Sequence, residues 1–145
     1  MAIARFCPDC NRPLLTRYHL TAILGEQIRE GLDFERKGVW RYRAVLPVQN
    51  PENILTLGEG GTPLVSAKRL ASRLGVTHLW IKDESLNPSG SFKARGMTVA
   101  MSRAYEFGVR KFCLPSAGNA AGAAAAYGAL AGCQVRVYMP ADSGD

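Results

Sequence analysis

The sequence predicts an α/β fold in which helices cover a parallel sheet. From residue 78 onward, apolar runs alternate with longer helical patterns in the order strand, helix, strand, helix, strand. Glycines stand where the two longer helices should end, at Gly108 and Gly132. Strands that alternate with helices along a chain are typical of parallel sheets, because a helix is the usual connection between parallel strands.

Each predicted element follows from a local pattern. Leu70, Ala71 and Leu74 share one face of a helix, and Gly75 stands at its C-cap. The same reasoning predicts strands at 78–82, 111–115 and 134–139, helices at 68–74, 91–107 and 119–131, a weaker helix at 20–30 and a proline-bounded linker at 47–51. Right-handed crossovers place the loops after the first two strands at the carboxyl edge of the sheet, where ligands bind in such folds.

Length and composition limit the classes of protein. The chain has 145 residues, 47% hydrophobic and 21% charged, as in one globular domain. Its net charge of +6 is spread without a basic run or interleaved aromatic residues, which favours small anionic ligands over nucleic acid. The start has no apolar signal core, and the apolar stretch at 120–131 is about half the roughly 20 residues of a membrane span. Together with four cysteines, these features predict a reducing, cytoplasmic setting without membrane insertion.

Two regions are predicted. Residues 1–52 form an N-terminal arm, and residues 53–145 form the core of the fold. The arm begins with Cys7 and Cys10, which are half of the four-ligand set that a structural zinc ion needs. We therefore predict no metal site. If the chain does bind a metal ion, Cys7 and Cys10 are the weak candidates for its ligands.

Two predictions concern packing in the core. The small side chains at 120–131 allow a helix to lie close against a sheet or another helix. Cys113 and Cys133 are expected to be buried as small apolar side chains.

Lys93 is the leading candidate for a chemical role. It follows a turn at 87–90 and a predicted N-cap at Ser91, which places it in the first turn of a helix. The helix dipole opposes a cation there, and this field together with partial desolvation favours the neutral amine. A neutral amine is what Schiff-base chemistry requires. Taken alone, a solvated surface lysine is the commoner interpretation.

A second candidate loop spans residues 116–119. Gly118 lets the backbone approach a ligand closely, and exposed N–H groups at a helix start bind carboxylate or phosphate. The Asn119 side chain can donate a hydrogen bond to a phenolate oxygen. The structural alternative is an ordinary helix entry that Ser116 or Asn119 caps.

Three motifs, in this order and spacing, resemble those of the fold-type II pyridoxal-phosphate enzymes. They are Gly-Glu-Gly-Gly-Thr-Pro-Leu at 58–64, Asn-Pro-Ser-Gly-Ser-Phe-Lys at 87–93 and Ser-Ala-Gly-Asn at 116–119. Within that superfamily the first two are most similar to those of the threonine synthase family, and the resemblance covers about residues 54–142. It implies the fold-type II architecture, the cofactor pyridoxal 5'-phosphate and a small amino-acid phosphate as substrate.

The resemblance also implies a role for each site residue. Lys93 would hold the cofactor as a Schiff base and move protons on the substrate carbons. Phe92 would pack near the cofactor ring, and Asn119 would hydrogen-bond the cofactor's 3-hydroxyl group. The substrate's carboxylate or phosphate would be bound by the whole loop: Ser116, Ala117, Gly118 and Asn119. In threonine synthases the reaction converts O-phosphohomoserine and water to threonine and phosphate, with the cofactor as electron sink.

Other functions stay open. Ala94 stands where threonine synthases usually have aspartate and related dehydratases have an apolar residue, which favours a threonine or serine dehydratase. The family's glycine-rich loop for the cofactor phosphate lies C-terminal to the matching region, so we expect a truncated core that is inactive or nearly so alone and exposes apolar surface. A catalytically silent binding module is a third interpretation. The resemblance to the family also implies a homodimer.

Overall fold

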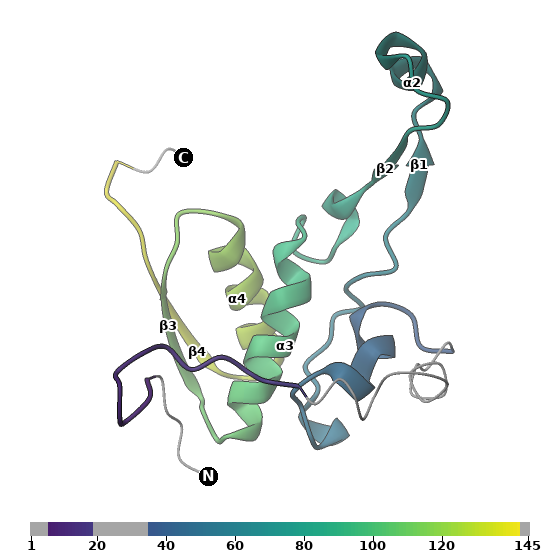
Figure 1. Cartoon of the computed structure of the whole chain (residues 1–145). Helices are drawn as coiled ribbons and strands as arrows, with labels where there is room; N and C mark the ends of the chain where they lie inside the picture. Colours follow the sequence, from purple (N-terminus) through teal and green to yellow (C-terminus); the bar gives the residue numbers. More distant parts are fainter. Residues whose placement is uncertain (1–5, 19–34, 143–145) are drawn as a thin grey trace.

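The computed structural model describes residues 6–18 and 35–142, and the helix expected at 20–30 lies outside them. An α/β body carries a projecting arm (Figure 1). The body contains α3 (Lys93–Glu106), β3 (Lys111–Pro115), α4 (Asn119–Leu130) and β4 (Gln134–Tyr138). The arm contains β1 (Leu64–Ser66), α2 (Lys68–Leu74) and β2 (Trp80–Lys82). The other described elements are 3-10 helices: η2 (Val39–Val45), η3 (Pro51–Asn53) and η4 (Glu84–Leu86).

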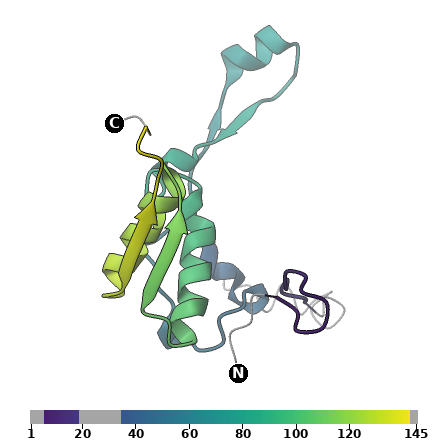
Figure 2. The ribbon, with the colours of Figure 1, turned by 90° about the vertical axis from the view of Figure 1, so that its left-hand side faces the viewer.

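The sheet of the body is parallel, as predicted. β3 pairs with β4 from Lys111 opposite Gln134 to Pro115 opposite Tyr138, and α4 connects the two strands. α3 packs beside α4, and both helices lie on one side of the sheet (Figure 2). Side chains on a strand alternate between the two faces. The half-buried members therefore point toward the helices: Phe112, Leu114, Val135 and Val137.

The prediction that Cys113 and Cys133 are buried is wrong. Cys113 is exposed, Cys133 is half-buried, and both are free thiols. The alternation along β3 turns Cys113 to the face opposite the helices, which no described element covers (Figure 2).

The prediction that residues 78–82 join the parallel sheet is also wrong. β2 pairs antiparallel with β1, with Leu64 opposite Lys82 and Ser66 opposite Trp80, in a separate sheet. β1 was not predicted, because its apolar run is only two residues long. An apolar pattern indicates that a segment is a strand but does not select its partner. In this chain β1 is the partner, and the two strands form the base of the arm.

Apolar side chains are exposed along the arm, as expected. Leu64 is 59% exposed, Leu74 62% and Trp80 54%. Both strands have exposed side chains on each face, since no described element packs against the arm (Figure 1).

The predicted helices are present with small shifts at their ends. α2 has the predicted bounds, and Gly75 ends it in the left-handed conformation with φ 67°. α3 begins at Lys93, and its N-cap is Phe92 rather than Ser91, so the predicted Ser91 cap is wrong. The Ser91 hydroxyl is buried and has no hydrogen-bond partner among the described residues. None of the helices in residues 6–18 and 35–142 is long and apolar enough to cross a membrane.

The segment before the core packs against α3. Trp40 and Val48 are buried, and the Glu106 side chain at the end of α3 accepts hydrogen bonds from the N–H groups of Gln49 and Asn50. The predicted linker at 47–51 therefore lies against the body. A domain boundary near residue 52 stays a prediction.

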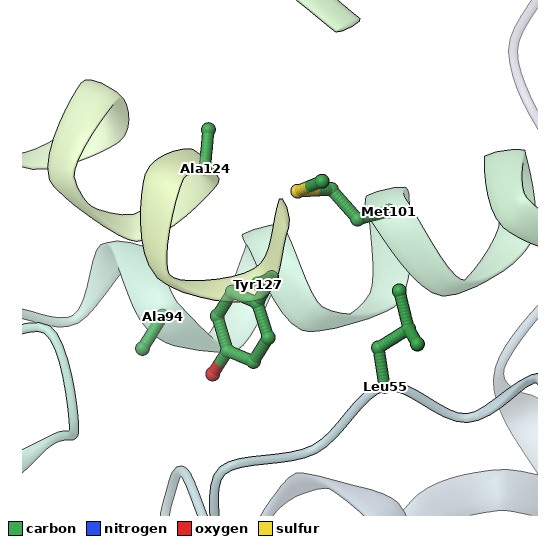
Figure 3. Packing of buried hydrophobic residues seen from close by; sticks show 5 residues of the cluster. All are labelled: Leu55, Ala94, Met101, Ala124 and Tyr127. Carbon is green, nitrogen blue, oxygen red and sulfur yellow. The ribbon is translucent and has the colours of Figure 1, made fainter. Parts of the chain in front are cut away.

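The core lies between α3, α4 and the segment at Leu55 (Figure 3). Its buried members are Leu55, Ala94, Met101, Ala124 and Tyr127. Small side chains on α4 allow the close approach that the sequence predicts.

Gly128 is where α4 comes closest to the sheet. A Cβ at this position would lie 2.2 Å from Val135 Cγ2, and the β-branched Val135 has little freedom to rotate away. We expect Gly128→Ala to lower the free energy of unfolding by about 2 kcal/mol, measured by urea unfolding and circular dichroism. In the matched control, Gly122→Ala on the same helix, the added Cβ meets no atom within 4 Å. That variant should be neutral or more stable by up to about 1 kcal/mol, and equal losses in both would contradict the close packing.

Candidate functional site

The two candidate loops lie at the same end of the body. α3 and α4 run in the same direction, so Lys93 and Asn119, their first residues, are both at the end where these helices begin (Figure 1). The loop at 116–119 follows the carboxyl end of β3, as predicted. The lysine loop does not follow a strand of this sheet, and it reaches the same end because α3 packs alongside α4.

Lys93 is an exposed amine in the first turn of α3. Its Nζ lies 4.6 Å from the centre of the Phe92 ring, and Phe92 is itself 56% exposed. Both side chains are therefore accessible to a ligand. The partial desolvation predicted for Lys93 is not present among the described residues.

Both helix starts present unpaired backbone donors. Among the described residues, the N–H groups of Phe92 and Lys93 at α3, and of Ala117, Asn119 and Ala120 at α4, donate no hydrogen bond. Neither helix has an acidic residue in its first turn. Unpaired N–H groups at a helix start attract anions, so this end of the body favours an anionic ligand.

Ser116 holds the second loop in place. Its N–H donates to the Tyr138 carbonyl at 3.0 Å, which continues the pairing of β3 with β4. Its hydroxyl accepts hydrogen bonds from the N–H groups of Gly118 at 3.3 Å and Ala121 at 3.2 Å. The N-cap residue of α4 is Gly118, so the predicted cap by Ser116 or Asn119 is wrong, although the Ser116 hydroxyl accepts one N–H of the first turn. A substrate contact by Ser116 stays a prediction. The Asn119 side chain is exposed and makes no hydrogen bond with the described residues.

An ion pair next to Lys93 was not predicted. Arg95 binds Glu84 through two hydrogen bonds, Nε to Oε2 at 2.6 Å and a terminal nitrogen to Oε1 at 2.8 Å. The Thr62 hydroxyl donates to Glu84 Oε1 at 2.5 Å. The bond between Thr62 and Glu84 links the first motif to η4, which precedes Lys93 in the chain.

Asn87 strengthens the same link. Its side-chain oxygen accepts the Gly60 N–H at 2.9 Å, and its amide nitrogen donates to the Glu84 carbonyl at 2.9 Å. The Lys82 ammonium donates to the Thr62 carbonyl. Two motifs that are about 20 residues apart in the sequence therefore form one unit beside Lys93, which explains why they occur together.

Two carboxylates, Glu84 and Glu106, make the stability of the fold depend on pH in the acid range. Hydrogen bonds from Arg95 and Thr62 lower the pKa of Glu84 to about 2 from an ordinary 4.5. Burial by itself would raise the pKa of Glu106, but N–H groups and Arg103 lower it to about 2. In both cases the folded-state pKa is the lower one. The stabilisation is therefore fully present above about pH 4.5 and is lost as the pH falls toward 2.

We expect the free energy of unfolding to fall steadily from about pH 4.5 to about pH 2. Urea unfolding at a series of pH values measures this slope, and Glu84→Gln together with Glu106→Gln should flatten it. Glu52→Gln is the control, since the Glu52 side chain is exposed. An unchanged slope in the double variant would contradict the assignment.

Glu59 is a buried carboxylate in the first motif, and no role was predicted for its side chain. It is 1% exposed. Oε1 accepts hydrogen bonds from Trp40 Nε1 and the Thr56 hydroxyl, both at 3.0 Å. Oε2 accepts from the Tyr127 hydroxyl at 2.6 Å and the Leu57 N–H at 3.0 Å. Tyr127 stands out in the sequence as the largest side chain in an otherwise small-residue helix, but this does not indicate Glu59 as its partner.

The hydrogen bonds decide the charge of Glu59. Burial would raise the pKa of its carboxyl, but the bonds from Tyr127 and Leu57 outweigh burial and lower it. Burial and the bond to Glu59 both raise the pKa of Tyr127. The pair is therefore an ionised carboxylate with a neutral phenol as its donor.

The weak metal candidates form a tight turn. The Cys7 N–H donates to the Arg12 carbonyl at 2.8 Å, and the Asn11 N–H donates to the Cys7 carbonyl at 2.9 Å. The backbone of Cys10, followed by that of Asp9, lowers the pKa of the Cys7 thiol. Residues 6–18 and 35–142 contain no group of three or more His, Cys, Asp or Glu placed to hold a metal ion. Metal binding by Cys7 and Cys10 stays a prediction.

Comparison with known families agrees with this geometry. A family described as pyridoxal-phosphate dependent enzymes matches residues 55–144, which include both candidate loops. The chain belongs to this family. The cofactor of the family is pyridoxal phosphate, as predicted from the three motifs.

Threonine synthases are among the most similar members of the family. The chain is 42% identical to the threonine synthase of Methanosarcina acetivorans over 93% of its own length and 32% of that protein. It is 41% identical to that of Methanocaldococcus jannaschii over 91% of its length and 33% of that protein. For Mycobacterium tuberculosis the identity is 46% over 68% of the chain and 27% of that protein. The chain thus spans about a third of the length of these curated relatives.

The exposed groups at the helix starts suit the cofactor of this family. Its aldehyde reacts with a primary amine, which Lys93 presents at the start of α3. Its ring oxygen needs a hydrogen-bond donor, and the Asn119 amide is exposed and unbonded among the described residues. The individual contacts of Lys93, Phe92 and Asn119 with the cofactor stay predictions.

Proposed function

We propose that this chain is the lysine-bearing part of a threonine synthase-like lyase with the fold-type II architecture. The observation that carries the proposal is the placement of Lys93 and Asn119 on two parallel helix starts at one end of the body. The identity to threonine synthases supports the substrate class, a small amino-acid phosphate. The proposed reaction converts O-phosphohomoserine and water to threonine and phosphate.

Each residue has a defined part in this proposal. Pyridoxal phosphate, when bound, withdraws electrons from the substrate carbons near the amino group. The Lys93 amine would hold the cofactor covalently through its aldehyde until the substrate's amino group displaces it, and the freed Lys93 amine would then take and return protons at the substrate carbons. The Asn119 amide donates a hydrogen bond to the cofactor's ring oxygen, and Phe92 packs against the ring.

The loop before α4 binds the anionic end of the substrate. The N–H groups of Ala117 and Asn119 are free among the described residues, and they lie at the positive end of the α4 dipole. A substrate carboxylate placed there holds the substrate carbons near Lys93. The loop consists of Ser116, Ala117, Gly118 and Asn119.

A chimera tests the reaction. Residues 1–140 are joined to the part of the Methanosarcina acetivorans threonine synthase that follows its matching region, which supplies the length that the chain does not span. We expect the chimera to release phosphate and form threonine in equal amounts from O-phosphohomoserine. A chimera that fixes pyridoxal phosphate on Lys93 yet releases no phosphate would contradict the proposal and favour a silent binding module.

A threonine or serine dehydratase is the second candidate. Ala94 is fully buried in the core beside Tyr127 and Ala124, so the chain accommodates at this place the apolar residue typical of dehydratases. Release of ammonia from threonine or serine by the chimera, without release of phosphate from O-phosphohomoserine, would select this function.

A further inference from the structure

A continuous path of buried hydrogen bonds connects α3 to α4. Trp40 Nε1 donates to Thr98 Oγ1 on α3 and to Glu59 Oε1, both at 3.0 Å. The Tyr127 hydroxyl on α4 donates to Glu59 Oε2 at 2.6 Å. All four side chains are buried, with Thr98 and Tyr127 fully so. The path therefore excludes water, and each of its bonds is stronger than it would be at the surface.

This path joins the two helices that carry the site. Thr98 is little more than one helical turn from Lys93, and Tyr127 is about two turns from Asn119. The other contacts between α3 and α4 include the small side chains Ala94 and Ala124, and Figure 3 shows Tyr127 reaching across from α4 beside Ala94. Contacts between small apolar groups are not directional, whereas hydrogen bonds are. The hydrogen bonds thus add directional constraints on how α4 is oriented relative to α3.

The residue after Glu59 is bonded to the turn at 87–90 that precedes Lys93. The Glu59 carbonyl accepts the Val39 N–H at 3.1 Å, and the next residue, Gly60, donates its N–H to Asn87 in the turn before Lys93. The first motif therefore contacts both helices. The Glu59 carboxylate binds Tyr127 on α4, and the adjacent Gly60 binds Asn87 in the turn before α3.

We propose that Glu59 is a positioning residue whose carboxylate sets the place of Asn119 relative to Lys93. This inference rests on the proposed function, because it requires both side chains to bind the same cofactor. Glu59 itself touches neither cofactor nor substrate and acts through Tyr127 and Trp40. Loss of one hydroxyl, that of Tyr127, should therefore disturb the start of α4 although the hydroxyl lies two turns away from it.

The first test uses the full chain without cofactor. Tyr127→Phe removes only the hydroxyl that binds Glu59. Ser102→Ala is the matched control, because the Ser102 hydroxyl is equally buried on α3 but accepts from the Leu55 N–H and has no bond to α4. Amide hydrogen exchange followed by mass spectrometry measures the opening of each helix start.

We expect Tyr127→Phe to speed exchange of the hydrogen-bonded N–H groups of Ala121 and Gly122, at the start of α4, by about tenfold or more, and Ser102→Ala to leave their exchange unchanged. Glu59→Gln, which keeps the shape of the side chain, should speed exchange of the same N–H groups. Unchanged exchange at the start of α4 in both Tyr127→Phe and Glu59→Gln would overturn the inference.

The second test uses the full chain with pyridoxal phosphate. The pH midpoint of the visible absorbance of bound cofactor is measured for Tyr127→Phe, for Asn119→Ala and for the double variant. If Tyr127 acts through Asn119, the midpoint of the double variant equals that of Asn119→Ala alone. Additive shifts would overturn the inference, since they would mean that Tyr127 affects the cofactor independently of Asn119.

The two tests separate this inference from the proposed function. Failure of the unmodified chain to fix cofactor on Lys93 counts against the proposed function. In that case amide hydrogen exchange in Tyr127→Phe and Glu59→Gln still shows whether the Glu59 carboxylate holds the start of α4 in place.

Discussion

Lys93→Ala is expected to abolish covalent fixation of pyridoxal phosphate on the chain. Among the described residues Lys93 presents an exposed primary amine at the shared end of α3 and α4, and covalent fixation of an aldehyde needs a primary amine. The chain is mixed with pyridoxal phosphate, reduced with borohydride and digested, and the labelled peptide is identified by mass spectrometry. We expect the label in the unmodified chain on the peptide that contains Lys93, and none in the variant.

Two further variants make this result specific. Lys93→Arg keeps the positive charge but removes the primary amine, so it should also lose the label. Lys111→Ala removes an exposed lysine at the opposite end of β3 and should keep it. Label that persists in Lys93→Ala at the same yield would show that the reaction is non-specific and would contradict the role of Lys93.

Glu59→Ala is expected to cause the largest loss of stability. Removing the carboxylate leaves the buried Tyr127 hydroxyl and the Leu57 N–H without their acceptor, and Trp40 keeps only its bond to Thr98. A buried donor without a partner costs about 1–3 kcal/mol, so we expect the free energy of unfolding to fall by about 3 kcal/mol. Urea unfolding followed by circular dichroism measures the change.

Milder and control variants bracket that result. Glu59→Gln keeps the side-chain volume and some of the hydrogen bonds, so its loss should be smaller. Glu52→Ala removes an exposed carboxylate nearby and should change the free energy of unfolding by no more than about 0.5 kcal/mol. A loss from Glu59→Ala no larger than that of Glu52→Ala would show that the buried cluster contributes nothing to stability.

The polar clusters beside the site could not be predicted. The candidate loops were found because each has a local signature, a lysine in a first helical turn and a glycine before a helix start. Glu59 and Tyr127 are 68 residues apart, and nothing in either local pattern indicates the other. Arg95 and Glu84 are closer in the sequence, but their pairing depends on how the chain turns between η4, which contains Glu84, and α3, which contains Arg95.

The course of the chain was predicted in part. Helices form where apolar residues repeat at helical spacing and glycine ends the repeat, so α2, α3 and α4 lie within two residues of their predicted bounds. The parallel pairing of β3 with β4 agrees with the helical connection through α4. The partner of β2 was assigned wrongly, because two apolar segments can each form a strand without being neighbours in the fold.

By itself the sequence determined the helices, the parallel pair of strands, the lysine at a helix start and the family to which the chain belongs. These depend on periodicity, caps and motifs, which are properties of adjacent residues. The tertiary structure alone decided that β2 joins β1 in a projecting arm, that Cys113 faces outward and that Glu59 connects the two helices of the site. Each of these depends on which distant segment supplies a hydrogen bond or covers a face, and no local pattern carries that information.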